Sequence, residues 1–232
     1  SPSDRADAQM RIFNADGSEG KMCGNGIRCV GKYLYDNGMV GGRTTITIDT
    51  LSGVKTLELH VRDGKMQTAR VDMGAAILEP AKIPVNMAGS SVIDAPLVVD
   101  EKVYHVTCVS MGNPHCVIFF NEDDVDDLDL SRLGPKFEHH PLFPERINTE
   151  FVNVLPDGSL KMRVWERGSG ETWACGTGAC ATGVAACLNG FCKPDTDITV
   201  HLRGGDLTIR YTTETVFMTG AAATVFKGEI EL

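Results

Sequence analysis

The chain has 232 residues, a length that accommodates two domains of modest size, each with its own hydrophobic core. Its hydrophobic content of 42% and charged content of 23% are ordinary for a globular protein, and no apolar run reaches the ~20 residues that span a bilayer. The net charge of -9, without a cluster of Lys and Arg, argues against nucleic acid and anionic membranes as partners. No secretory signal pattern opens the sequence, so we expect a cytoplasmic location.

Strands dominate the predicted elements, because β-branched and alternating segments are separated by turn residues such as Asp63-Gly64. The first half predicts strand 9–13, helix 27–35, strand 44–48 and a hairpin of strands 54–61 and 66–73. The second half predicts strands 103–110 and 116–120, helix 124–137, a hairpin of strands 150–154 and 160–165, helix 178–188, and strands 198–202, 207–212, 215–219 and 223–232. Both Cys-adjacent helices are predicted to stop at an Asn-Gly pair.

Eight cysteines could suggest a disulfide framework, but their positions argue for free thiols. Several lie in apolar runs such as 116–120, where Cys behaves as a small buried hydrophobe. A chain of this length can bury a hydrophobic core and does not need disulfide bonds for stability. The sequence has no Cys-x2-Cys pair of the kind that binds zinc. We therefore expect reduced cysteines and no metal site.

Two cysteine-glycine turns, Cys23-Gly24-Asn25-Gly26 and Cys175-Gly176-Thr177-Gly178, lie 152 residues apart and share their flanks. A glutamate lies four residues upstream of each cysteine, an aromatic residue ten upstream and a glycine eight downstream. Each segment ends in Asn-Gly at the same offset. The pattern indicates an internal duplication in which each half presents one cysteine.

A cysteine at the start of a helix gains negative-charge stabilisation, which predicts a lowered thiol pKa. The adjacent glycines let backbone N–H groups approach a bound anion. One such turn is a weak signal, but two copies with matching flanks favour function. Two equivalent thiols on opposite faces of one carbon could remove a proton from one face and return one to the other.

Other polar candidates come from three further segments. Asn14 and Glu166 occupy the same position in the two copies, nine residues before each cysteine. The adjacent Arg167 could hold a carboxylate, although alone it would indicate a surface ion pair. The loop that carries Asn113 and His115 lies between two predicted strands, and a histidine there is as often structural as catalytic. Asn148 leads into a strand and is a plausible ligand group.

The duplication also predicts the domain organisation. We expect an N-terminal lobe over 1–80, joined by strand 222–232, and a C-terminal lobe over 81–221. Far more residues precede Cys175 in its half than the 22 that precede Cys23, so we expect the start of the first lobe to be missing.

Five segments together resemble the diaminopimelate epimerase family over essentially the whole chain: residues 13–19, 22–29, 112–115, 165–168 and 174–180. The resemblance implies an α/β (α+β) fold of two similar, pseudo-twofold related lobes, each a β-sheet wrapped around a central helix. It implies a cofactor-independent isomerase of lysine and peptidoglycan precursor biosynthesis that interconverts LL- and meso-diaminopimelate. It also implies a small-molecule substrate, a homodimer, and no nucleic-acid or membrane partner.

Carried over by position, the resemblance makes Cys23 and Cys175 the two bases. His115 and Glu166 would support them by orienting the reacting amino acid. The residues implied to bind substrate are Asn14, Gly24, Asn25, Asn113, Asn148, Glu166, Arg167, Gly176 and Thr177. The N-terminal Gly-Asn-Asp-Phe segment of the family and a following substrate-binding Gln are absent from this sequence.

Two alternatives remain at this level. A proline or hydroxyproline racemase shares the two-cysteine arrangement, but that family carries His where Asn25 stands and an Asp-Arg-Ser-Pro stretch before its second cysteine. A non-catalytic binding protein of the same fold, with a redox-sensitive cysteine pair, is the alternative from another class.

Overall fold

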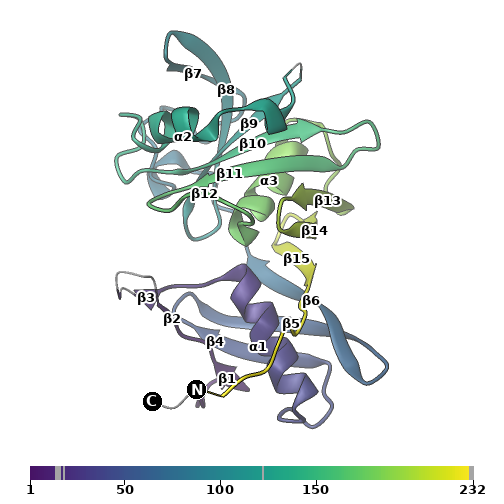
Figure 1. Ribbon diagram of the computed structural model, residues 1–232. Helices are drawn as coiled ribbons and strands as arrows, with labels where there is room; N and C mark the ends of the chain where they lie inside the picture. Colours follow the sequence, from purple (N-terminus) through teal and green to yellow (C-terminus); the bar gives the residue numbers. More distant parts are fainter. Residues whose placement is uncertain (14–16, 18, 122, 230–232) are drawn as a thin grey trace. The chain divides into compact units, whose positions relative to one another are not determined.

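The computed structural model describes residues 1–13, 17, 19–121 and 123–229, and the chain forms two compact units (Figure 1). The N-terminal unit comprises Ser1–Val71 and Thr219–Leu232, and the C-terminal unit comprises Asp72–Met218. The chain passes from one unit to the other within strands β6 (Lys65–Gly74) and β15 (Val216–Ala221). The two boundaries therefore differ by a few residues from the predicted lobes 1–80 and 81–221.

The N-terminal unit places helix α1 (Gly24–Asp36) against a sheet in the order β1-β4-β5-β6. Its remaining elements are β1 (Ala8–Gln9), β2 (Ile12–Phe13), β3 (Glu19–Gly20), β4 (Thr45–Thr50) and β5 (Gly53–Arg62). Strand β1 runs parallel to β4, whereas β4, β5 and β6 are antiparallel neighbours. Strands β2 and β3 form a separate two-stranded sheet.

The C-terminal unit builds a larger sheet in the order β14-β13-β11-β10-β9-β8-β7, with β12 paired to β11. Its strands are β7 (Ala95–Val99), β8 (Lys102–Ser110), β9 (Pro114–Phe120), β10 (Asn148–Val154), β11 (Leu160–Glu166), β12 (Gly170–Thr172), β13 (Asp197–Leu202) and β14 (Gly205–Tyr211). Its helices are α2 (Leu130–Glu138), α3 (Gly176–Leu188) and the 3-10 turns η1 (Pro80–Lys82) and η2 (Val125–Asp127). Strands β9 and β10 are parallel, as are β11 and β13.

The duplication predicted around the two cysteines extends through the strands of both units. Every residue pair that joins β4 to β5 has a counterpart 152 positions later between β13 and β14, as Thr45–Glu58 has in Asp197–Arg210. The same offset relates the pairing of β2 with β3 to that of β11 with β12, and the pairing of β1 with β4 to that of β11 with β13. The two copies therefore match over these elements without an insertion or deletion.

The two central helices end in the same way. Each stops at its Asn-Gly pair, where Gly38 has a φ of 71° and Gly190 a φ of 78°. In both copies the N–H after the glycine bonds the carbonyl five residues back at 2.9 Å. This is the left-handed glycine cap that the Asn-Gly signal predicts.

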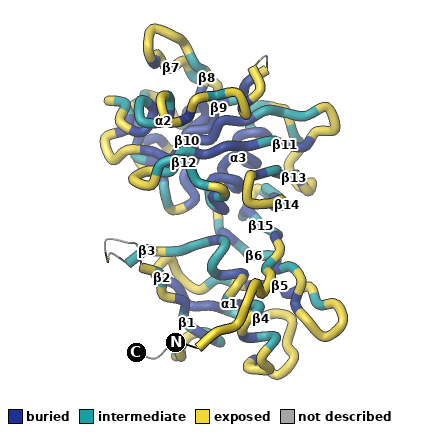
Figure 2. The backbone as a smooth tube through the Cα atoms, in the orientation of Figure 1, coloured by how far each residue is buried: buried dark blue, intermediate teal, exposed yellow. Residues whose placement is uncertain are grey.

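The two helices differ in how deeply they are buried. Residues 178–186 of α3 are all buried, and the helix contacts β8, β9, β10, β13 and β14 (Figure 2). Helix α1 packs on β4 and β5, and Cys29 and Tyr33 on it are exposed. On the other face of the larger sheet, α2 packs Phe137 edge-on against Phe151. Each unit is thus a sheet around a helix, as expected for the α+β fold.

Three predicted elements need correction. Residues 124–137 form the short turn η2 followed by α2, because Asp129 begins a new helix by accepting a hydrogen bond from the Arg132 N–H. The described part of the predicted strand 223–232 is irregular, since β15 ends at Ala221. The predicted strand 9–13 is split into β1 and β2.

Candidate active site

Both cysteines cap their helices as the duplication predicts. Cys23 and Cys175 have extended backbones and stand immediately before α1 and α3. The sulfur of Cys23 accepts a hydrogen bond from the Gly26 N–H at 3.3 Å, and that of Cys175 accepts one from the Gly178 N–H at 3.4 Å. Each sulfur is therefore fixed at the positive end of a helix, where negative charge is stabilised.

In the C-terminal unit, a continuous chain of side chains leads from β10 to the sulfur of Cys175. Glu150 Oε1 lies 2.7 Å from Nδ1 of His115, and Nε2 of His115 lies 3.0 Å from Oδ1 of Asn113. The amide nitrogen of Asn113 lies 3.2 Å from the hydroxyl of Thr177, which lies 3.5 Å from Sγ of Cys175. The structure thus brings together His115, Asn113, Thr177 and Cys175, which the sequence predicts as site residues.

Fold topology explains this convergence. Parallel strands β9 and β10 begin side by side, with His115 opposite Asn148 in the register. Glu150 lies two residues further along β10, on the same face as Asn148. The loop before β9 supplies Asn113, and α3 starts beside these strand ends, so polar groups distant in sequence meet at one place.

Carboxylates surround Cys175 and reverse the expected effect on its pKa. Burial raises the pKa of the Cys175 thiol, and the charges of Glu166 and Glu150 raise it further, against hydrogen bonds from Thr177 and the Gly178 N–H. The prediction that the helix N-terminus lowers the pKa of this thiol is therefore wrong. The thiol form of Cys175 is therefore favoured over the thiolate.

Glu166 lies at the end of β11, where its Oε1 accepts a hydrogen bond from the Thr172 hydroxyl. The following turn is fixed from two sides. Asn148 Oδ1 accepts the Arg167 N–H at 2.9 Å, and Glu138 Oε1 accepts the Gly168 N–H at 2.9 Å. Glu166 and Arg167 are thereby presented on a rigid turn, and the Arg167 side chain is exposed.

Asn148 has a more internal role than the one predicted. Besides accepting the Arg167 N–H, it donates from Nδ2 to the Pro114 carbonyl at 2.7 Å, and it is buried. It therefore connects the loop before β9 to the turn after β11. A direct contact between Asn148 and substrate stays a prediction.

In the N-terminal unit, the turn at Cys23 is held by α1 itself. The Arg28 side chain donates to the Gly24 carbonyl at 3.0 Å and to the Ala221 carbonyl at 3.2 Å. Gly24 is buried and Asn25 is half-buried beside Cys23. Gly176 is the buried counterpart of Gly24 in α3. Asn14 lies outside the described residues.

Glu150 is the residue that the sequence analysis misses. It is completely buried, and its Oε2 has no hydrogen-bond partner in the described part of the structure. A side chain at Gly178 would place its Cβ 2.6 Å from Glu150 Oε1, so glycine is required there. The available signal was an acidic residue at a core position of the predicted strand 150–154, which is costly unless it is paired.

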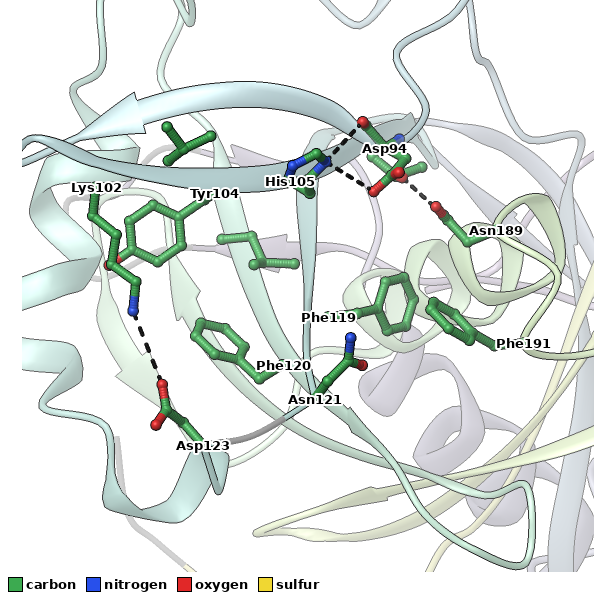
Figure 3. Close-up of a pocket in the computed structure, with 13 residues that line it drawn as sticks. Asp94, Lys102, Tyr104, His105, Phe119, Phe120, Asn121, Asp123, Asn189 and Phe191 are labelled. Atoms are coloured by element: carbon green, nitrogen blue, oxygen red, sulfur yellow. Dashed lines mark hydrogen bonds and ion pairs between the residues drawn. The ribbon is translucent and has the colours of Figure 1, made fainter.

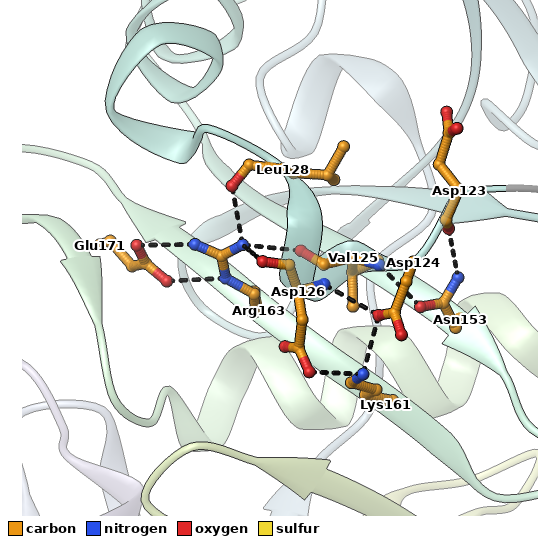
Figure 4. Close-up of polar contacts among 9 residues, drawn as sticks. All are labelled: Asp123, Asp124, Val125, Asp126, Leu128, Asn153, Lys161, Arg163 and Glu171. Carbon is orange, nitrogen blue, oxygen red and sulfur yellow. Dashed lines mark hydrogen bonds and ion pairs between the residues drawn. The ribbon is translucent and has the colours of Figure 1, made fainter.

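Two other hollows of the C-terminal unit carry no comparable chemistry. One lies at the far end of α3 from Cys175, beside Asn189, and its charged side chains pair with one another (Figure 3). Examples are His105 with Asp94 at 3.2 Å and Lys102 with Asp123 at 3.9 Å. A smaller one lies beside Lys161 and Arg163, whose charges are likewise paired (Figure 4).

Within the described part of the chain, all eight cysteines are free, and no group of three or more His, Cys, Asp or Glu is placed to hold a metal ion. Among the same residues, no helix is long and apolar enough to cross a membrane.

The fold resembles those of solved epimerases and racemases. A hydroxyproline epimerase from Agrobacterium vitis superposes with a TM-score of 0.70 over 94% of this chain and 69% of that one, at 17% identity. A probable proline racemase from Agrobacterium radiobacter superposes with a TM-score of 0.75 over 100% and 74% of the two chains, at 15% identity. At such identities the likeness concerns the fold alone.

The sequence specifies the family. The family model described as diaminopimelate epimerase matches residues 1–79 and 107–225. The diaminopimelate epimerase of Agathobacter rectalis is 55% identical over 100% of this chain and 82% of its own length. That of Acetivibrio thermocellus is 54% identical over 100% and 81%, and that of Methanococcus maripaludis is 49% identical over 100% and 82%. The chain belongs to the diaminopimelate epimerase family of isomerases, which confirms the resemblance found in the sequence.

Proposed function

We propose that this protein interconverts LL- and meso-diaminopimelate by removing the α-proton on one face and returning a proton on the other. The observation that carries the proposal is the pair of equivalent cysteines, each capping the central helix of its own unit. Family membership at 49–55% identity supports this substrate, whereas the likeness to proline racemases is at fold level.

The chemistry requires both a base and a strong local field. An α-proton beside a carboxylate and an ammonium is very weakly acidic, so the developing carbanion must be stabilised as it forms. Backbone N–H groups at the starts of α1 and α3, around Gly24 and Gly176, are suited to bind the reacting carboxylate. Asn113 and Arg167 would hold the distal amino-acid end of the substrate, and Glu166 its reacting ammonium.

The surroundings of Cys175 suit one of its two roles. Burial and the adjacent carboxylates favour its thiol form, which suits Cys175 to act as the acid in one direction of the reaction. After turnover the roles are exchanged. A proton must then return to Cys175 before the same isomer reacts again.

Deuterium exchange tests the function and the substrate together. LL-diaminopimelate and L-proline are incubated separately with the reduced protein in heavy water, and α-deuterium and isomer composition are followed by NMR and chiral chromatography. We expect exchange and meso product with diaminopimelate alone. Exchange with proline instead would favour the racemase alternative, and exchange with neither would favour a non-catalytic binding protein.

Substitution of the cysteines tests the two-base mechanism. Cys23→Ala and Cys175→Ala are each expected to abolish formation of the meso isomer, because each removes one of the two proton carriers. If the Cys23→Ala protein formed meso product at the wild-type rate, the mechanism would be wrong. Oxidation with diamide, followed by peptide mapping, should link Cys23 to Cys175 if both sulfurs approach one carbon.

We also propose a cytoplasmic homodimer. Eight free cysteines are compatible with a reducing compartment, and the family resemblance suggests the dimer. Light scattering coupled to size exclusion measures the molar mass, for which a dimer of the 25.0 kDa chain is expected. A monomer across the working concentration range would contradict this assignment.

A further inference from the structure

The buried Glu150 is not explained by packing. Its side chain is fully buried, one oxygen contacts His115 and the other has no partner among the described residues. Burying a carboxylate with an unsatisfied oxygen costs folding free energy. Gly178, which leaves space for this carboxylate, also donates to the sulfur of Cys175, so the costly group lies directly beside a proposed catalytic thiol.

The hydrogen bonds between Glu150 and Cys175 have a defined direction. Oδ1 of Asn113 can only accept, so the ring nitrogen facing it, Nε2 of His115, must carry a proton. The Asn113 amide then donates to the Thr177 oxygen, which leaves the Thr177 hydroxyl proton free to point at Sγ of Cys175. All donors in this chain therefore point toward the sulfur.

A neutral ring that carries its proton on Nε2 has only a lone pair at Nδ1, so Glu150 must be the donor there, as a carboxylic acid whose Oε1 lies 2.7 Å away. The direction of the hydrogen bonds therefore depends on Glu150. A neutral histidine exchanges easily between its two tautomers, and the group beside Nδ1 decides which one is populated. Without Glu150, the proton could move to Nδ1, and Asn113 would then rotate its amide to donate to Nε2. Its oxygen would face Thr177 and capture the hydroxyl proton, so the sulfur would lose a donor.

We propose that Glu150 is a positioning residue that, through His115, aims the Asn113 and Thr177 donors at the sulfur of Cys175. The donor from Thr177 stabilises the thiolate that forms when Cys175 gives its proton to the substrate carbanion. No bond beyond this proton transfer is formed or broken. The catalytic part of the proposal rests on Cys175 acting as acid and base, as proposed above.

Three ionisable side chains lie around the hydrogen bonds that connect Glu150 to Cys175. Glu166 on β11 faces both of these residues, and the other two are the thiols of Cys108 on β8 and Cys116 on β9. Burial raises the pKa of Glu150, the contact with His115 opposes the rise, and the charge of Glu166 adds to it. A raised carboxyl pKa means that Glu150 contributes most to stability below its unfolded pKa, and that this contribution is lost as pH rises through the folded pKa. Glu150 is thus a stability cost near neutral pH.

The first test is histidine NMR, which needs no activity. Nitrogen-15 spectra of the wild-type protein, assigned by His115→Gln, should show protonated Nε2 on His115, and the Glu150→Met protein should show the proton transferred to Nδ1. The control is Glu138→Gln, which replaces another buried glutamate that takes no part in the hydrogen bonds between Glu150 and Cys175. It should leave the His115 signals in place. An unprotonated Nε2 in the wild-type protein would overturn the proposal, even if Glu150→Met did not fold.

The second test compares kinetics with stability. Glu150→Met should raise the melting temperature, since it removes a buried unpaired oxygen, while kcat falls about tenfold with little change in KM. Thr177→Val should lower kcat similarly, and the double variant should be little worse than either single variant. Unchanged kcat in Glu150→Met, or additive losses, would overturn the proposal. If the wild-type protein showed no deuterium exchange at the α-carbon of diaminopimelate, the proposed function would be contradicted. The NMR result on His115 would still be valid.

Discussion

Asn148 illustrates how one side chain can organise a site from within the protein. Its amide nitrogen donates to the Pro114 carbonyl and its amide oxygen accepts the Arg167 N–H. Asn153 makes the same kind of connection further along β10, to the Phe120 carbonyl at 3.0 Å and the Val125 N–H at 2.9 Å. The two asparagines share a strand and a role, but only Asn148 adjoins the candidate site.

This difference predicts different effects of one substitution. Asn148→Asp places an oxygen against the Pro114 carbonyl and removes a donor, which should cost about 1–3 kcal/mol of stability. It should also raise KM for diaminopimelate, because Arg167 loses its support. Asn153→Asp should lower the melting temperature by a comparable amount while KM stays the same. Equal KM values for the two variants would contradict the positioning role of Asn148.

The cysteine environments show what a sequence reveals about single residues. The glycine turns and Asn-Gly stops predict two thiols at helix N-termini, and both are observed. The pKa of Cys175 moves in the other direction because the thiol is buried and because Glu166 and Glu150 approach it from strands, and no spacing in the sequence indicates either effect. Local motifs specify local geometry, whereas electrostatics depend on tertiary neighbours.

At the level of elements, the central helices need small residues where the sheet crosses them. An added Cβ at Gly183 would lie 2.7 Å from Cγ2 and 3.1 Å from Cβ of Ile209. At the equivalent Gly31, the nearest atom is Cδ2 of Leu57 at 2.9 Å. A leucine end can rotate aside, but the branched Cβ of isoleucine is fixed by its backbone.

Alanine substitutions at these two glycines should therefore lower the stability of the protein by different amounts. Both substitutions gain helix propensity, so their difference reports packing. Gly183→Ala should be less stable than Gly31→Ala by about 1–2 kcal/mol, which corresponds to several degrees in melting temperature. Calorimetry of the two variants measures this difference. A greater loss in Gly31→Ala would contradict the packing argument.

The prediction of helices and strands succeeded where the alternation of hydrophobic residues or a helix-capping signal was strong. It failed where pairing with a distant strand determines the structure. The hairpins β5–β6 and β10–β11 are confirmed, and so are helices α1 and α3. Strand β7 was missed because its sequence begins Ala95-Pro96 and becomes a strand only by pairing with β8. The predicted strand after β15 is wrong, since the described residues beyond Ala221 form no strand, and the Ala222 N–H bonds the Gln67 carbonyl of β6 at 3.2 Å without continuing the ladder.

At the level of the whole chain, the two copies share a framework but differ in what surrounds it. Arg11 pairs with Glu19 at 2.7 Å, and 152 residues later Arg163 pairs with Glu171 at 2.9 Å. The Arg11 side chain is 51% exposed, whereas that of Arg163 is 6% exposed. Arg163 also donates to the carbonyls of residues 125, 126 and 128, and so fastens η2 to β11 (Figure 4).

The same substitution at the two arginines should therefore have unequal effects. Arg163→Met leaves three carbonyls without their donor in a buried place and removes one of the two arginines that pair with Glu171, the other being Arg203 at 2.8 Å, so it should cost about 3–5 kcal/mol of stability. Arg11→Met removes an exposed pair and should cost less than ~1 kcal/mol. High salt should weaken the Arg11 pair and barely affect the Arg163 network. Denaturant unfolding of both variants at two salt concentrations measures these differences, and equal losses would mean that burial does not distinguish the duplicated ion pairs.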